Sequence, residues 1–169
     1  PTVGSVITAS MNLDIDAEWQ WYRVDSRGEM AILNARSAEY IVTSGDIGCY
    51  LRVKASGTGE YASLVGEAQT SRAVAVLSVS LSDDQPQVGQ TLTANLAPVS
   101  AEALYQWYRG SDPRHMSPIL GASGSTYTVT SEDIGAYLRV VAIGTGAYTG
   151  YFAMATTSGV AVLAAPLPA

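Results

Sequence analysis

The chain has 169 residues, of which 47% are hydrophobic and 14% are charged, and this composition favours folded domains over disorder. Its formal net charge is −6 and it holds a single lysine, which argues against a basic surface for nucleic acids or anionic membranes. No apolar run approaches the roughly 20 residues of a membrane-spanning helix, so no membrane insertion is expected.

The first half of the sequence is repeated in the second half. The block Gln20–Arg23 returns as Gln106–Arg109, and Asp46–Val53 returns as Asp133–Val140 with one difference, Ala136 in place of Cys49. The other shared blocks are Gly57–Gly59 with Gly144–Gly146 and Val74–Leu77 with Val160–Leu163. Blocks that recur in the same order predict a duplicated structural unit.

Each copy has the length of one small domain, so the repeat predicts two domains with separate cores. We expect the first domain over residues 1–77, the second over 78–163, and an extended, proline-containing tail or linker over 164–169. Hardly any linker separates the two copies, which favours a restricted relative orientation of the domains.

The first copy begins later in the repeat than the second copy does. Pro1–Gly4 matches Pro86–Gly89, so nothing in the first copy corresponds to Ser78–Leu81. The first domain is therefore expected to lack its opening strand and to leave a sheet edge unpaired. This asymmetry further predicts that the chain was cut from a longer array of repeats.

Short strands separated by turn residues follow one another along the second copy, and no segment has a useful helical periodicity. The expected strands are Ser78–Ser82, Gly89–Leu96, Leu104–Arg109, a weak segment at Ile119–Leu120, Thr126–Thr130, Ala136–Ile143 and a final run over about Phe152–Leu163. About seven strands in roughly 90 residues predict an all-β sandwich.

The segments Thr43–Gly48 and Thr130–Gly135 precede the sixth strand of each copy. Both contain threonine followed three residues later by aspartate, a spacing that permits one capped helical turn. The glycine that follows allows a positive φ. These segments are expected to carry the chain between the two sheets of each domain.

The strand motifs of the second copy occur in combination in one known group of proteins. They are Val88–Ala94, Tyr105–Arg109, Thr126–Val140 and Gly144–Gly150. In this combination the chain resembles the tandem immunoglobulin-like (Ig-like) repeats of bacterial surface and secreted proteins. The resemblance implies two tandem Ig-like Greek-key β-sandwiches in an extracellular protein.

The resemblance also assigns structural roles to residues that both copies share. Trp21 and Trp107 would be the core tryptophans, and Tyr50 and Tyr137 would resemble the tyrosine corner, whose hydroxyl bonds to upstream backbone. All residues with an expected core or corner role are Trp21, Trp107, Tyr50, Tyr137, Asp46, Asp133, Gly48 and Gly135.

Two features depart from an antibody domain. Cys49 is the only cysteine, so no intramolecular disulfide can form and apolar burial must hold each core. Leu51 and Val53 alternate with Tyr50 and Arg52, which indicates that the leucine and valine side chains face inward.

Aromatic residues surround the expected hairpin tip of the second domain and form a candidate binding tip. They are Tyr148, Tyr151 and Phe152. Exposed aromatic rings at such a place can stack on a sugar or anchor a protein partner. Tyr148 recurs as Tyr61, so a packing role for this tyrosine is the alternative.

Asp14, Asp16 and Glu18 form a candidate calcium site. Alternate residues of an extended segment face the same way, so three carboxylates could converge on a hard cation such as Ca²⁺. The alternative is a solvated acidic loop, and apart from this possible calcium no cofactor is expected.

The sequence offers no catalytic residues. His115 lies in the polar segment 111–117 beside serine and aspartate, but no nucleophile motif accompanies it, and an exposed loop histidine is the expected reading. The adjacent carboxylates Asp83–Asp84 and Glu132–Asp133 fall in turns. The chain is therefore not expected to be an enzyme.

The resemblance implies a non-catalytic structural or adhesive module at a bacterial cell surface, acting as a rigid spacer or as an interaction domain. Its partners would be adjacent Ig-like or functional domains of the same polypeptide, with a surface protein or a glycan as a further partner. The alternative is a carbohydrate- or protein-binding accessory module of a larger secreted enzyme.

Overall fold

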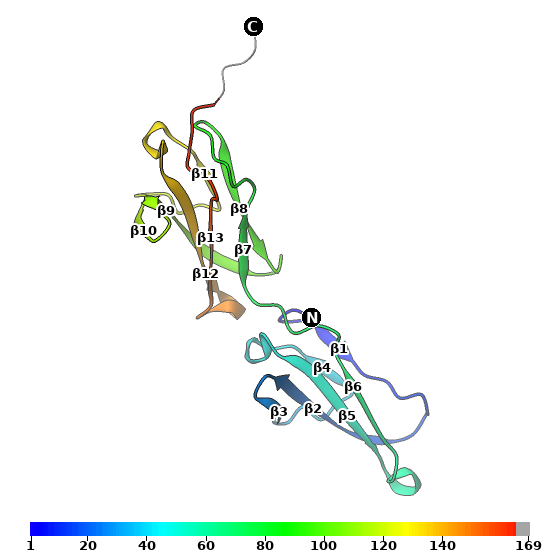
Figure 1. The fold of residues 1–169 in the computed structure, drawn as a ribbon. Coiled ribbons are helices and arrows are strands. Elements are labelled where there is room, and N and C mark those ends of the chain that lie inside the picture. The colour runs from blue at the N-terminus through cyan, green and yellow to red at the C-terminus, as the bar shows by residue number, and fades with distance from the viewer. Residues whose placement is uncertain (165–169) are drawn as a thin grey trace. The chain divides into compact units, whose positions relative to one another are not determined.

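The structure, a computed structural model, describes residues 1–164 (Figure 1). The chain divides between Val76 and Leu77 into two compact units. Strands and short 3-10 turns make up both units, and the described residues contain no helix that is long and apolar enough to cross a membrane. Apart from residue 164, the expected tail over 164–169 lies outside the described residues.

The second unit has two antiparallel sheets that face each other across one core. One sheet has the order β11-β8-β7 and the other the order β10-β9-β12-β13. The strands are β7 (Ser78–Leu81), β8 (Thr91–Ala97), β9 (Glu102–Asp112), β10 (His115–Pro118), β11 (Thr126–Thr128), β12 (Tyr137–Thr145) and β13 (Phe152–Thr156). The weak segment expected at Ile119 lies just after β10, and the final run breaks after Thr156.

The first unit repeats this plan with one strand fewer among the described residues. Its sheets have the orders β1-β4 and β3-β2-β5-β6, so β1 has no second neighbour where β8 has β7. The strands are β1 (Val6–Thr8), β2 (Ala17–Asp25), β3 (Gly28–Ala31), β4 (Glu39–Ile41), β5 (Tyr50–Gly57) and β6 (Val65–Gln69).

A tryptophan lies at the centre of each core. Trp21 and Trp107 are 2% and 0% exposed, and each stacks on a tyrosine, Tyr40 or Tyr127, with ring centroids 5.5 Å apart. The indole N–H donates to a backbone oxygen in both units, that of Ser37 or of Gly124. The indole therefore contributes a large apolar area to the core while its polar atom stays paired.

The repeated Gln-Trp-Tyr-Arg block makes contacts with several other parts of its unit. The Gln20 amide donates to the backbone oxygens of Trp21 and Ile32, both at 2.8 Å, and thereby ties β2 to the segment after β3. Gln106 does the same in the second unit. The arginine of the block, Arg23, reaches a buried carboxylate.

That carboxylate belongs to the capped turn that the sequence predicts, and the structure confirms a 3-10 turn at Ser44–Asp46 and another at Ser131–Asp133. Asp46 is fully buried, and its Oδ2 accepts hydrogen bonds from Tyr40 Oη at 2.8 Å and from the Thr43 N–H at 2.7 Å. Its Oδ1 accepts from Arg23 Nε at 2.6 Å. The charge of Asp46 is thus compensated by an ion pair and hydrogen bonds, as a buried carboxylate requires.

Asp133 has the same surroundings, with one difference. Its Oδ2 accepts from Tyr127 Oη at 2.7 Å and from the Thr130 N–H at 2.8 Å. Arg109 Nη1 lies 3.2 Å from Oδ1, an ion pair without hydrogen-bond geometry. Asp133 therefore accepts no hydrogen bond at Oδ1, whereas Asp46 accepts one there from Arg23.

The prediction that Tyr50 and Tyr137 form tyrosine corners is wrong. Tyr50 is 40% exposed and Tyr137 is half-buried, because the alternation along β5 and β12 turns Leu51 and Leu138 inward and these tyrosines outward. The inward face made by leucine and valine is confirmed. Tyr40 and Tyr127 supply the buried hydroxyl groups instead.

Candidate functional site

The exposed side of the β10-β9-β12-β13 sheet carries a cluster of apolar side chains. We call this cluster, made of Leu104, Val141, Ile143, Phe152 and Met154, the apolar face. Leu104, Ile143 and Phe152 are direct cross-strand partners on β9, β12 and β13, and Val141 is paired with Met154 in the next row. Residues two apart on a strand lie on the same side of the sheet, so the two rows form one surface.

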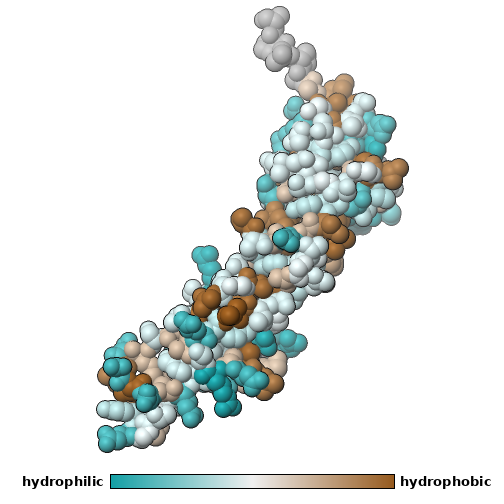
Figure 2. All heavy atoms as spheres, turned by 180° about the vertical axis from the view of Figure 1, so that it is seen from behind, coloured by the Kyte–Doolittle hydropathy of each residue, from teal (hydrophilic) through white to brown (hydrophobic). Residues whose placement is uncertain are grey.

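Four of these side chains are well exposed. Leu104 is 66% exposed, Phe152 65%, and Ile143 and Met154 are each 51% exposed. Figure 2 shows that hydrophobic side chains reach the molecular surface among hydrophilic ones. Single exposed apolar residues are ordinary, whereas adjoining ones on a rigid sheet are typical of interaction surfaces.

The first unit shows that the fold does not require an apolar face. Matching the strand registers of the two units pairs each apolar position with a residue of β2, β5 or β6. Leu104, Val141, Ile143 and Met154 correspond in this way to Glu18, Lys54, Ser56 and Glu67. The fifth position, Phe152, corresponds to Val65, which is also apolar and 69% exposed. The same sheet thus folds with polar residues at four of these five positions, so the fold does not require apolar side chains there.

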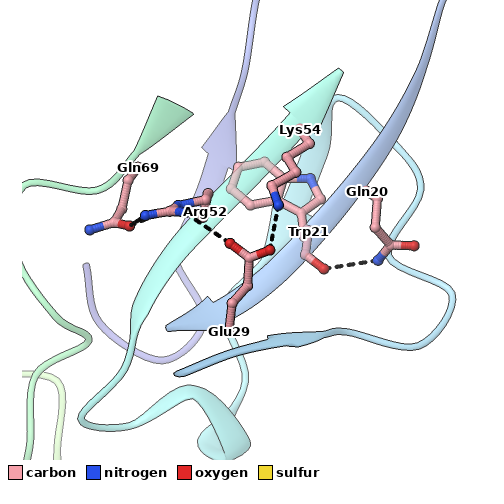
Figure 3. A network of polar contacts seen from close by, with 6 residues as sticks. All are labelled: Gln20, Trp21, Glu29, Arg52, Lys54 and Gln69. Atoms are coloured by element: carbon pink, nitrogen blue, oxygen red, sulfur yellow. Dashed lines mark hydrogen bonds and ion pairs between the residues drawn. The ribbon is translucent and has the colours of Figure 1, made fainter. Parts of the chain in front are cut away.

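A charged network covers the corresponding sheet of the first unit (Figure 3). Arg52 donates to Glu29 at 2.9 Å and to Gln69 Oε1, and Lys54 forms an ion pair with the same glutamate. The hydrogen bond between Lys54 and Glu29 is the largest cause of the lowered pKa of Glu29, and it also raises the pKa of Lys54. Partly exposed ion pairs of this kind contribute little to stability.

Only two of the three residues of the candidate binding tip are exposed. Tyr148 is 2% exposed in the turn Gly146–Tyr148, whereas Tyr151 is 39% and Phe152 is 65% exposed. Phe152 instead joins the apolar face. Sequence reasoning missed Leu104, Ile143 and Met154, although a position-by-position comparison of the two copies would have shown apolar residues replacing charged or polar ones.

The candidate calcium ligands Asp14, Asp16 and Glu18 are not brought together. Over residues 1–164, no group of three or more histidine, cysteine, aspartate or glutamate side chains is arranged to hold a metal ion. β2 begins only at Ala17, so the two aspartates lie in a loop where the alternation of an extended strand does not hold.

His115 lies at the start of β10, in the hairpin with β9. Its ring is 83% exposed and Nδ1 lies 3.2 Å from Asp112 Oδ2. The pair is a surface contact of a hairpin, with the imidazole open to solvent.

No family model matches the sequence, and no curated protein matches it. Solved structures that are similar to the chain include the N-terminal four Ig domains of Dscam1 isoform 4.44, at 15% identity and a TM-score of 0.40, with 96% of this chain and 42% of that chain covered. For isoform 6.9 the identity is 14%, the TM-score 0.38 and the coverage the same. The N-terminal eight Ig domains of Down Syndrome Cell Adhesion Molecule isoform 1.30.30 match at 15% identity and a TM-score of 0.39, with 96% of this chain and 21% of that chain covered.

The chain thus spans less than half the length of these Ig-domain chains. At such identities and TM-scores the likeness says nothing about function. The class of the fold follows from the sheets themselves: each unit is an Ig-like β-sandwich without a disulfide, and two of them follow one another in the chain.

Proposed function

We propose that this chain is a non-catalytic, adhesive Ig-like module of an extracellular protein, and that its second unit binds a protein partner through the apolar face. The observation that carries the proposal is the difference between the two copies. Leu104, Ile143 and Met154 are exposed on the second unit, whereas the same positions of the first unit hold Glu18, Ser56 and Glu67.

The chemistry of the apolar face favours a protein partner over a glycan. Sugar sites usually combine flat aromatic rings with converging polar groups, whereas this face combines one aromatic ring with leucine, isoleucine, valine and methionine. Phe152 at 65% exposure offers an anchor of the kind found at the centre of protein interfaces. Methionine adapts to irregular partner surfaces because its side chain is flexible and polarisable.

The first unit suits a different task. Its sheet carries the charged network of Glu29, Arg52 and Lys54 (Figure 3), and hardly any linker separates the two copies in the sequence. We therefore propose that it acts as a spacer between adjacent domains of the same polypeptide, and the resemblance of the sequence motifs to bacterial surface repeats favours a cell-surface or secreted protein as the context.

A swap of residues between the two copies tests the adhesive role. The variant Leu104→Glu/Ile143→Ser/Met154→Glu gives the second unit the residues with which the first unit already folds. We expect binding of the whole chain to an array of extracellular proteins to be lost at least about tenfold, with an unchanged melting temperature. The matched control Val99→Ser/Leu120→Ser removes two fully exposed apolar residues outside the face, and it should bind like the unmodified chain.

A glycan array is probed in parallel with the same variants. Protein binding that survives the swap contradicts the proposal. Binding to a glycan that is lost on Tyr151→Ala/Phe152→Ala, without any protein binding, supports the carbohydrate-binding accessory module instead.

A further inference from the structure

Strand β13 forms one edge of the larger sheet of the second unit, and among the described residues its only strand neighbour is β12. The Gly144 N–H donates to Tyr151 O just before the strand begins. Backbone groups alternate in direction along a strand, so those of Phe152, Met154 and Thr156 point away from β12. Within the described part of the chain these backbone groups make no hydrogen bond.

The edge formed by β13 lacks the features that usually prevent an edge strand from pairing with another chain, which are a bulge, a proline or a charged side chain. At the opposite edge of the same sheet, β10 has a register irregularity between His115 and Ser117 and ends in Pro118. The sequence of β13 is Phe-Ala-Met-Ala-Thr and contains none of these features. Its backbone edge is therefore open to a further strand.

The corresponding edge strand of the first unit, β6, carries a charge at its centre. By register with β5 and β12, Glu67 corresponds to Met154. Two copies of β6 paired antiparallel about this position would set two carboxylates opposite each other, which is destabilising. Two copies of β13 paired in the same way set two methionine side chains opposite each other. The residue at this position therefore decides whether the edge can pair with itself.

We propose that the second unit binds a second copy of this chain through β13, with the two strands antiparallel about a two-fold axis at Met154. In this register Met154 lies opposite Met154 of the second copy, and Phe152 lies opposite Thr156 of the second copy. The backbone groups that point away from β12 then pair with their equivalents. The two four-stranded sheets become one continuous sheet.

The same register brings complementary side chains together. Phe152, Met154 and Thr156 alternate along β13 and lie on one side of it. Phe152, which is 65% exposed, comes next to Thr156 of the second copy, whose hydroxyl accepts a hydrogen bond from Arg139 Nε at 2.8 Å. A guanidinium near an aromatic ring is a favourable contact, and methionine side chains pack adaptably across the axis.

This self-complementarity favours a second copy over an unrelated strand. Each copy supplies both the aromatic ring of Phe152 and the position beside Arg139 that receives it, as a two-fold interface requires. The pairing uses the edge of the sheet and leaves both apolar faces on the same side of the joined sheet. It goes beyond the proposed function and does not depend on a partner for the apolar face. One short strand from each copy makes a small interface, so we expect a Kd between about 10 μM and 1 mM.

Cysteine pairs test the register in a chain that carries Cys49→Ala, because alanine already occupies the matching position 136 of the second unit. Phe152→Cys mixed with Thr156→Cys should form disulfide-linked dimers on mild oxidation. Directly opposite residues have Cα atoms about 5.5 Å apart, within reach of a disulfide. Each variant alone should give at least about tenfold less linked dimer, because its two cysteines would be offset by about 13 Å along the strands.

Sedimentation velocity of the full chain at concentrations up to about 1 mM measures the association itself. Met154→Glu should weaken it at least about tenfold by setting two carboxylates opposite each other, at a position where the first unit already folds with glutamate. The matched control Leu104→Glu adds the same charge to the same side of the sheet, but on β9 and away from the edge. It should associate like the unmodified chain.

A chain that remains monomeric at about 1 mM overturns the proposal, even if the strand of another protein is found to bind the β13 edge. Equal amounts of linked dimer in the mixed and the separate cysteine variants also overturn it, since this indicates contact without the two-fold register. Association that Leu104→Glu weakens as much as Met154→Glu does so too, because it places the contact on the apolar face and not at the edge.

Discussion

Replacing either buried aspartate with asparagine should reveal that the two copies hold the carboxylate with unequal strength. In Asp46→Asn, the amide oxygen can take the place of Oδ2 and keep the Thr43 and Tyr40 hydrogen bonds. The amide nitrogen then takes the place of Oδ1, where Arg23 Nε lies 2.6 Å away. Two donors face each other there, and the ion pair is lost.

The magnitudes follow from these contacts. Removing one partner of a buried ion pair costs about 3–5 kcal/mol, and the 26% exposure of the Arg23 side chain lets it partly rehydrate, so about 3 kcal/mol is expected for Asp46→Asn. In Asp133→Asn no hydrogen bond to Oδ1 is lost. The 3.2 Å ion pair with Arg109 is lost, but Arg109 keeps its bond to Glu132 at 2.9 Å and so retains a carboxylate partner. The expected cost there is about 1–2 kcal/mol, from weaker hydrogen bonds to a neutral acceptor.

Native-state hydrogen exchange of the full chain measures both costs, because peptides from β2 and β5 report on the first unit and peptides from β9 and β12 on the second. Each variant should lower the free energy of opening only in its own unit, so the other unit is an internal control. Equal losses in the two variants, or a loss below about 1 kcal/mol in Asp46→Asn, would refute the reasoning.

Three further changes test the cores. Burial, followed by the hydrogen bond to Asp133, raises the pKa of Tyr127 from 10.0 to about 12, so this hydroxyl stabilises the second unit fully below pH 10.0 and the contribution is lost as the pH rises through about 12. Denaturation midpoints against pH should show that loss, and Tyr127→Phe should remove it. Gly144→Ala should destabilise the second unit by about 2 kcal/mol or more in urea denaturation, because the added Cβ would lie 2.3 Å from the Tyr148 backbone oxygen. Trp107→Ala should cost about 3–5 kcal/mol, and a nearly unchanged melting temperature would contradict its place at the centre of the core.

Because the sequence is duplicated, much of the fold could be predicted from it. Trp21 and Trp107, the alternating leucine and valine residues, and the capped turn at Asp46 all follow from local patterns that occur twice. Comparison of the copies also indicated a missing first strand, and the structure shows a two-stranded sheet among the described residues of the first unit.

The tyrosine roles could not be predicted from the same patterns. Tyr40 and Tyr50 both belong to strands and both are followed by apolar residues. Which of them meets the carboxylate of Asp46 depends on how the two sheets stack, because Tyr40 comes from one sheet and Arg23 from the other. The spacing of six residues between Tyr40 and Asp46 recurs between Tyr127 and Asp133, but only the tertiary structure shows that these side chains meet and that the arginine reaches them from the other sheet.

Sequence alone determined the strands, their inward faces and the repeated cores, since these depend on alternation and turn chemistry between near neighbours in the chain. The tertiary structure decided the surfaces. The apolar face draws its residues from β9, β12 and β13. Such surfaces exist only once cross-strand register places distant side chains next to each other.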